Sequence, residues 1–193
     1  MSISILYQNN RTGDAFDITS LCTGAKWATK RIGTPASLEL TTFANSDVAW
    51  THGGILALKD DKNGLFYGYV VKVSQNEKDQ VTVTAYDQTW YLKKNKETYV
   101  FANKRADEIL TQIAADFDLV CGAMENTGYV IPSMVEDGQT LFDIALTALD
   151  HTLVHTGKMY VLWDDFGSLR ITDVAKSKLD LFVGDRSIAT GYT

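Results

Sequence analysis

The stretch TAYDQTWYLKKNKETYVF (Thr84–Phe101) separates two kinds of sequence pattern. Before it and into its first residues, apolar and polar residues alternate, as in Val81, Val83 and Ala85, which is the period of a β-strand. After it, apolar residues recur every three or four positions, which is the period of a helix with one buried face. The stretch itself carries five aromatic residues around three lysines. It therefore predicts the end of a β-rich part and the start of a helical part.

The part before this stretch reads as a set of short strands separated by Gly, Asn and Asp, which is typical of an antiparallel sandwich or barrel. Asn63-Gly64 tolerates a positive φ and predicts a tight hairpin turn. A polar loop at Gln75–Asp79 predicts a second hairpin. The candidate strands are Ser2–Tyr7, Ala15–Leu21, Ala25–Arg31, Ala36–Phe43, Ile55–Lys59, Leu65–Gln75 and Gln80–Tyr86. We expect an antiparallel β-barrel or sandwich over residues 1–101.

The part after this stretch predicts two helices and a hairpin. Residues 103–117 form one apolar stripe, with Asn103 as its expected cap. Thr140 and Asp143 have the spacing of a capping box, and Gly157 fits the end of that second helix. A hairpin at 159–172 follows. We expect an α/β sub-domain over residues 102–183 and the start of a further strand at 184–193, where the chain reads as truncated. The fold class is α+β, rich in β-structure.

Composition and charge narrow the possible functions. The chain has 193 residues, is 45% apolar and 22% charged, and carries a net charge of −6. Residues 1–101 hold 11 basic and 10 acidic groups (+1), whereas residues 102–193 hold 7 and 14 (−7). Nucleic-acid affinity that is independent of sequence needs many Lys or Arg contacts to phosphates. The charge argues against a general polyanion binder, and it suits an acidic channel wall or assembly face.

The aromatic and basic residues of the opening stretch allow three interpretations. Aromatic rings beside Lys93, Lys94 and Lys96 are the components of a single-strand nucleic-acid groove. Alternatively, Tyr86 ends a strand, Trp90 and Tyr91 close the bottom of a β-core, and the lysines lie in solvent. A third possibility is a rim that meets another subunit, because Trp and Tyr are favoured at interface cores.

Short motifs with possible chemistry are incomplete. His151 and His155 have the i, i+4 spacing that can hold one zinc ion, but no motif supplies a third ligand. Asp165-Phe166-Gly167 spells the metal-binding triplet of protein kinases, without the other kinase motifs. No catalytic constellation stands out, so we expect a protein that is not an enzyme and that uses no cofactor or metal.

Two regions resemble prophage tail proteins of the XkdQ/YqbQ family, which is PBSX-like. The pattern Tyr-Asp-x-x-x-Tyr-Leu-x-x-Asn-Lys-x-Thr of that family is similar to Tyr86, Asp87, Tyr91, Leu92, Asn95, Lys96 and Thr98. The region 137–173 is similar to a broader pattern of contractile-tail hubs and secretion-system spikes, in which a helix leads to an aromatic strand, a Gly turn and a further strand.

The resemblance implies a structural baseplate hub protein. Such proteins form a trimeric ring that joins the tail tube to the spike around a channel, after assembly in the host cytoplasm. Expected partners are further copies of the chain, the tube, the spike and other baseplate proteins, with no membrane and no specific nucleic acid. The residues that we assign to the motif or to a possible interface are Tyr86, Asp87, Trp90, Tyr91, Leu92, Asn95, Lys96, Thr98 and Tyr99.

Two other classes of function stay open. One is a tail-associated peptidoglycan hydrolase, which needs a pair of carboxylates in a groove. The other is a carbohydrate- or receptor-binding module, which an exposed platform formed by Trp27, Trp50 or Trp163 would favour.

Overall fold

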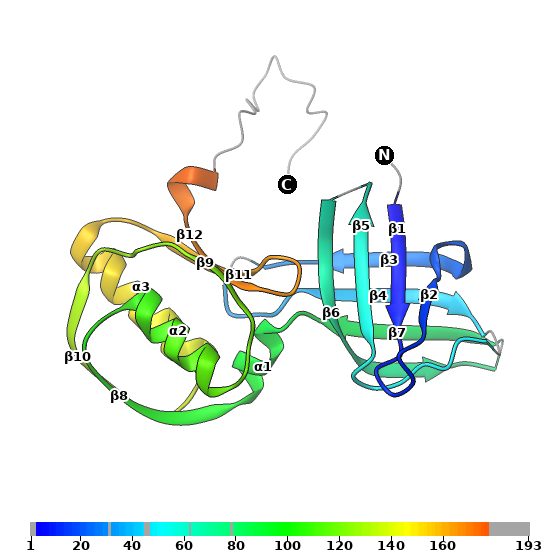
Figure 1. Ribbon diagram of the computed structural model, residues 1–193, viewed down its shortest axis with the longest axis horizontal. Coiled ribbons are helices and arrows are strands. Elements are labelled where there is room, and N and C mark those ends of the chain that lie inside the picture. Colours follow the sequence, from blue (N-terminus) through cyan, green and yellow to red (C-terminus); the bar gives the residue numbers. More distant parts are fainter. Residues whose placement is uncertain (1–2, 31, 45–46, 62, 78, 178–193) are drawn as a thin grey trace, which may run out of the picture.

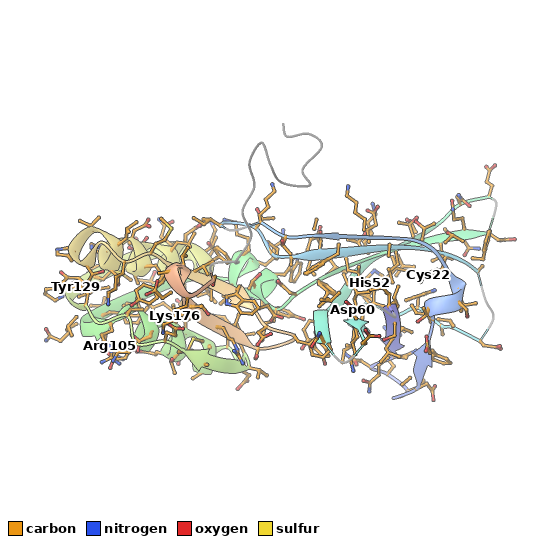
Figure 2. The ribbon with its side chains drawn as sticks, turned by 90° about the horizontal axis from the view of Figure 1, so that it is seen from above. Cys22, His52, Asp60, Arg105, Tyr129 and Lys176 are labelled. Atoms are coloured by element: carbon orange, nitrogen blue, oxygen red, sulfur yellow. The ribbon has the colours of Figure 1, made fainter. Side chains whose placement is uncertain are left out.

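The computed structural model describes residues 3–177 apart from 31, 45–46, 62 and 78 (Figure 1). The predicted strand at 184–193 lies outside the described residues. Two lobes lie side by side along the long axis of the molecule in both views (Figures 1 and 2). Each lobe has its own hydrophobic core, one built from residues 5–85 and the other from residues 92–171.

The first lobe is one antiparallel sheet of seven strands in the order β2-β1-β5-β6-β7-β4-β3. In Figure 1, β1 and β5 run across the direction of β3 and β4, so the sheet curls into an open half-barrel. This is the antiparallel barrel-like fold that the alternating pattern predicts. The strands are β1 (Ile3–Gln8), β2 (Ala15–Asp17), β3 (Cys22–Ala28), β4 (Ser37–Phe43), β5 (Ile55–Asp60), β6 (Asn63–Gln75) and β7 (Gln80–Tyr86).

The alternation in β7 works as the sequence predicts. Val81, Val83 and Ala85 are buried in the core of the first lobe, while Thr82 and Thr84 are half-buried on the other face. Successive side chains of a strand point to opposite faces, so this pattern can bury only one side of the sheet. The concave side of the curl therefore becomes the core.

The predicted turn at Asn63-Gly64 is wrong by two residues. β5 ends at Asp60, which pairs with Asn63, and Asp61 takes the positive φ of 50°. Aspartate tolerates the left-handed region better than most residues, so the turn does not need the glycine. Gly64 instead pairs with Lys59 inside the hairpin and serves a close contact described below.

Among its described residues, the second lobe packs three α-helices against two small sheets. Strands β8 and β10 form an antiparallel ribbon that curves around helices α2 and α3 (Figure 1), and the other sheet has the order β11-β12-β9. The elements are α1 (Thr89–Lys94), β8 (Lys96–Arg105), α2 (Ala106–Asp116), β9 (Cys121–Met124), β10 (Val130–Thr140), α3 (Leu141–Thr156), β11 (Tyr160–Asp164) and β12 (Leu169–Asp173). The two predicted helices and the hairpin are present. The strand β8 passes through residue 101, and the division of the chain there stays a prediction.

Helix α3 begins and ends where the sequence indicates. The Thr140 hydroxyl accepts the N–H of Asp143, and Gly157 takes a φ of 68° and donates its N–H to the Leu153 carbonyl. The predicted cap of α2 is wrong, because Asn103 lies in β8. The cap is Arg105, two residues after Asn103. The Arg105 N–H donates to the Glu108 carboxylate, so this backbone group has a partner at the start of the helix.

Candidate functional site at the junction of the lobes

The connection between β7 and α1 fastens the two lobes together through buried polar side chains. Asp87 accepts hydrogen bonds from the Ala36 N–H (3.1 Å), the Thr89 N–H (3.0 Å) and the Thr89 hydroxyl (2.5 Å). Gln88 donates to the Val120 carbonyl and accepts the Val120 N–H. Asp87, Gln88 and Thr89 are all buried. The motif residue Asp87 therefore ties the β3–β4 connection to the start of α1.

A hairpin from the second lobe reaches back onto the sheet of the first lobe. The turn between β11 and β12 places the Phe166 ring against Tyr67, with ring centroids 5.5 Å apart. The ammonium group of Lys59 lies 5.4 Å from the centre of the same ring. The kinase-like triplet Asp165-Phe166-Gly167 thus forms a contact between lobes, and sequence reasoning did not find this role.

An open groove of about 560 Å³ lies along this junction. Its walls come from the end of β3, the start of β6, the Asp87 connection and strand β11. Trp27 is 45% exposed and Trp163 is 40% exposed, and both line the groove. Trp50 is different, because it packs on Tyr7 with ring centroids 4.4 Å apart. Two of the three tryptophans considered as a platform therefore border one groove.

Two carboxyl groups beside the groove, the buried Asp87 and the half-buried Asp164, differ in the number of hydrogen bonds that they accept. Burial raises the pKa of Asp164 to about 7, and the negative charges of Asp87 and Asp165 raise it as well. Hydrogen bonds from the Gly167 N–H and the Gln88 amide lower this pKa and offset part of the rise. Burial also raises the pKa of Asp87, while its bonds to Thr89 and Ala36 lower it. Asp87 thus has three donors for its charge, whereas Asp164 has one clear donor, the Gly167 N–H (2.8 Å).

The aromatic motif residues pack mainly on each other. Trp90 stacks on Tyr86 at 6.4 Å and meets Tyr91 edge-on at 5.5 Å, and Tyr91 meets Tyr69 of β6 at 5.6 Å. All of these rings are half-buried. They join α1 to the first lobe, and they do not enter the main β-core as the second interpretation of the stretch proposed.

The remaining motif residues organise the start of the second lobe. Leu92 is fully buried in its core. The Asn95 amide donates to the Tyr91 carbonyl and its backbone carbonyl accepts the Leu141 N–H, so it links α1 to α3. Thr98 and Tyr99 lie in β8 and donate their hydroxyls to Asp137 and Asp116. Lys96 is the exposed first residue of that strand.

Several basic and histidine side chains have partners within the chain. Lys93 lies 3.3 Å from the Asp143 carboxylate, and Lys94 lies over the Trp90 ring. His155 stacks on Tyr129, and its Nδ1 lies 2.8 Å from the His151 carbonyl oxygen. Within the part of the chain that the structure describes, no three His, Cys, Asp or Glu side chains form a group that could hold a metal ion. In that same part, no helix has the length and apolarity to cross a membrane.

Comparison with known proteins places this fold among phage tail proteins. The 43 kDa tail protein of prophage MuSo2 from Shewanella oneidensis has a TM-score of 0.69 at 15% identity, over 88% of this chain and 52% of that one. The c3393 protein of Escherichia coli, a type VI secretion component described as similar to the T4 tail proteins gp27 and gp5, has a TM-score of 0.55 at 9% identity. This match covers 89% of this chain and 46% of the c3393 protein.

The sequence relatives are more specific. The phage-like element PBSX protein XkdQ of Bacillus subtilis is 35% identical over 144 residues, which are 72% of this chain and 44% of that protein. The chain spans less than half the length of the curated relatives it matches. The model of the family described as YqbQ-like matches residues 25–193. This chain belongs to the YqbQ-like family.

Proposed function

We propose that this chain is a structural part of a phage tail, acting in a baseplate hub that joins the tail tube to the spike. The observation that carries the proposal is the curled sheet of the first lobe, whose fold is shared with prophage tail proteins. A type VI secretion component with described similarity to T4 tail proteins shares it too. A hub of this kind works by assembly, so the role needs surfaces rather than catalytic groups.

The two ends of the sheet suit ring formation. β3 is an edge strand of seven residues, and all of its residues from Thr23 to Ala28 are exposed. The other end is the three-residue strand β2. An edge strand presents unpaired N–H and C=O groups, which bind readily to another chain. Contacts between unlike edges of successive copies close into a ring when the rotation between copies permits. We propose a trimer with tube, spike and baseplate proteins as neighbours, assembled in the host cytoplasm and retained in the tail particle.

Ala25→Glu tests the edge as an assembly surface. Ala25 is exposed on β3, so the substitution is expected to change the free energy of unfolding by less than about 0.5 kcal/mol. It puts an unpaired carboxylate where a neighbouring strand would pair, so the ring fraction is expected to fall at least tenfold. Mass measurement by light scattering on this chain and on a chain of its relatives' length gives the readout.

The matched control for this test is Val154→Glu, which adds the same charge on α3 at a side chain that is 79% exposed. It is expected to leave assembly intact. A variant at Ala25 that assembles as well as the wild type would contradict the role of the β3 edge. Clearing of a peptidoglycan gel by the purified chain would contradict the structural role and favour the hydrolase.

The two exposed tryptophans of the groove favour one second function, a carbohydrate-binding module. Indole faces stack on the apolar faces of sugar rings, and Trp27 and Trp163 border the same groove. Titration with chitotetraose, followed by tryptophan fluorescence, is expected to give saturable binding that Trp27→Ala and Trp163→Ala each weaken at least tenfold. Phe43→Ala removes an exposed ring outside the groove and serves as the control. Absence of binding at millimolar sugar would remove this function.

A further inference from the structure

The tip of the β11–β12 hairpin is a tight turn with an unusual residue at its first position. Asp165 and Ser168 exchange backbone hydrogen bonds of 2.8 and 3.2 Å around Phe166 and Gly167, whose φ angles are 48° and 89°. Two successive positive φ angles match the twist of a hairpin, but a bulky residue is rare in this region. Such conformations persist only where surrounding contacts fix them. The Phe166 ring therefore needs a specific seat.

The seat lies on β6, and its shape fits the tip closely from both sides. A Cβ atom added to Gly64 would lie 2.3 Å from the Phe166 ring, so only glycine leaves room for it. A Cβ atom added to Gly167 would lie 2.8 Å from the Tyr67 ring. Ring contacts of Phe166 with Tyr67 and Lys59 complete the seat. This contact bridges two lobes whose hydrophobic cores are separate.

Asp164 sits at the base of this tip, in a place that suits a neutral carboxyl group. One of its oxygens accepts the Gly167 N–H, and the other is enclosed, with no hydrogen bond of good geometry. Asp87 is buried nearby, and its three donors offset part of the cost of a negative charge there. A charge on Asp164 would lie near the first one, with one carboxylate oxygen enclosed and without a hydrogen bond, which is costly. Of the two groups, Asp164 is thus the one that keeps a proton.

We propose that the hairpin tip is a proton-controlled latch between the lobes. With a proton on Asp164 the Phe166 ring stays seated on β6, and loss of this proton releases the ring so that the carboxylate reaches water. The other groups that face Asp164 do not neutralise it. Arg170 is paired with Asp165 at 2.9 Å, and Lys59 lies over the Phe166 ring. Lys30 also lines the groove, and the structure gives it no ion pair with Asp164. Tyr67 and Tyr69 of β6 are phenols whose pKa values burial raises further.

The sign and size of the effect follow from linkage. The seated state has the higher Asp164 pKa, so it binds the proton more tightly and is favoured at low pH. Stability that the proton supplies is present below the ordinary carboxyl pKa and is lost as pH rises through about 7. The ratio of seated to released tip is therefore expected to fall about tenfold between roughly pH 6 and 8.

Nuclear magnetic resonance of the isotope-labelled chain between about pH 5.5 and 8.5 tests the latch. The Asp164 carboxyl carbon and the amide signals of Gly64 and Gly167 are expected to share one midpoint near 7. Asp164→Asn keeps the oxygen that accepts the Gly167 N–H and cannot ionise, so its two amide signals should not change with pH. Asp150→Asn removes an exposed carboxylate on α3 and should keep the transition.

A second variant reads the coupling in the opposite direction. Phe166→Gly removes the ring while the turn keeps a conformation that glycine favours. If seating the ring favours the proton, releasing the ring must lower the pKa of Asp164 toward the ordinary carboxyl range. The latch is overturned if the Asp164 carboxyl titrates in that range in the wild type. It is also overturned if Asp164 titrates near neutrality without the amide signals, or if Phe166→Gly leaves its pKa unchanged.

Discussion

Replacing Gly68 by alanine is expected to lower the free energy of unfolding by about 3 kcal/mol, because β6 and β7 leave no room for a methyl group there. The added Cβ would lie 2.4 Å from the Tyr86 carbonyl oxygen and 2.7 Å from the Tyr86 carbonyl carbon. These are backbone atoms at the end of β7, so no side-chain rotation relieves the clash. Either the end of β7 moves, which disturbs Asp87 next to it, or the sheet separates.

Gly24→Ala is the matched control for this prediction. It lies in β3 of the same sheet, and its Cβ would meet the nearest atom, Thr41 Cβ, at an ordinary 3.9 Å. Its effect on stability is expected to stay within about 0.5 kcal/mol. Urea unfolding followed by tryptophan fluorescence measures both variants. Equal stability of the two variants would show that the backbone at Tyr86 can move without loss of stability. The close approach of Gly68 to Tyr86 would then not stabilise the junction.

The elements that the sequence predicts well are those that local spacing determines. Strand β7 follows from strict alternation, and α3 follows from an apolar stripe between Thr140 and Gly157. The hairpin of β11 and β12 likewise follows from two short apolar runs around a turn. In each case the pattern, the cap and the packing agree, because the buried face of the element lies against the core of its own lobe.

The ribbon of β8 and β10 was missed because its pairing depends on distant residues. Val100 pairs with Val135, and both side chains are largely exposed on the outer face of the ribbon. An exposed apolar pair on a two-stranded ribbon lacks the usual alternation of buried apolar and exposed polar residues. The prediction that Asn103 caps α2 was wrong for a related reason. Asparagine is typical of helix caps, but Asn103 lies in β8, the strand just before the helix.

The candidate site was predicted in part. The motif stretch contains Asp87, but the sequence does not show that Gln88 meets Val120 or that Asp164 lies beside Asp87. These contacts join residues more than 30 and more than 70 positions apart. Gly64 illustrates the limit most clearly. In the sequence, Gly64 follows Asn63, and this dipeptide favours a turn. In the structure, Gly64 lies in the hairpin strand, where its lack of a side chain leaves room for the Phe166 ring.

Replacing Asp87 by alanine is expected to lower the free energy of unfolding by about 3 kcal/mol, because it removes the acceptor of three hydrogen bonds at once. The N–H groups of Ala36 and Thr89 and the Thr89 hydroxyl lose their partner, and Thr89 itself is buried. An unpaired buried donor costs about 1–3 kcal/mol of stability. Replacing Asp87 should therefore lower the free energy of unfolding more than replacing an exposed aspartate. Asp150→Ala on α3 is the matched control, with an expected change within about 0.5 kcal/mol.

Asp87→Asn separates the hydrogen bonds from the charge. Asparagine keeps one acceptor oxygen, so the free energy of unfolding of this variant should lie between those of the wild type and of the alanine variant. Because burial raises the pKa of Asp87, the wild type loses stability as the pH rises from the ordinary carboxyl range through this higher value. The asparagine variant has no such loss, so its deficit should shrink between about pH 4 and pH 7 in urea unfolding experiments. A deficit that grows with pH would mean that the Asp87 charge stabilises the junction.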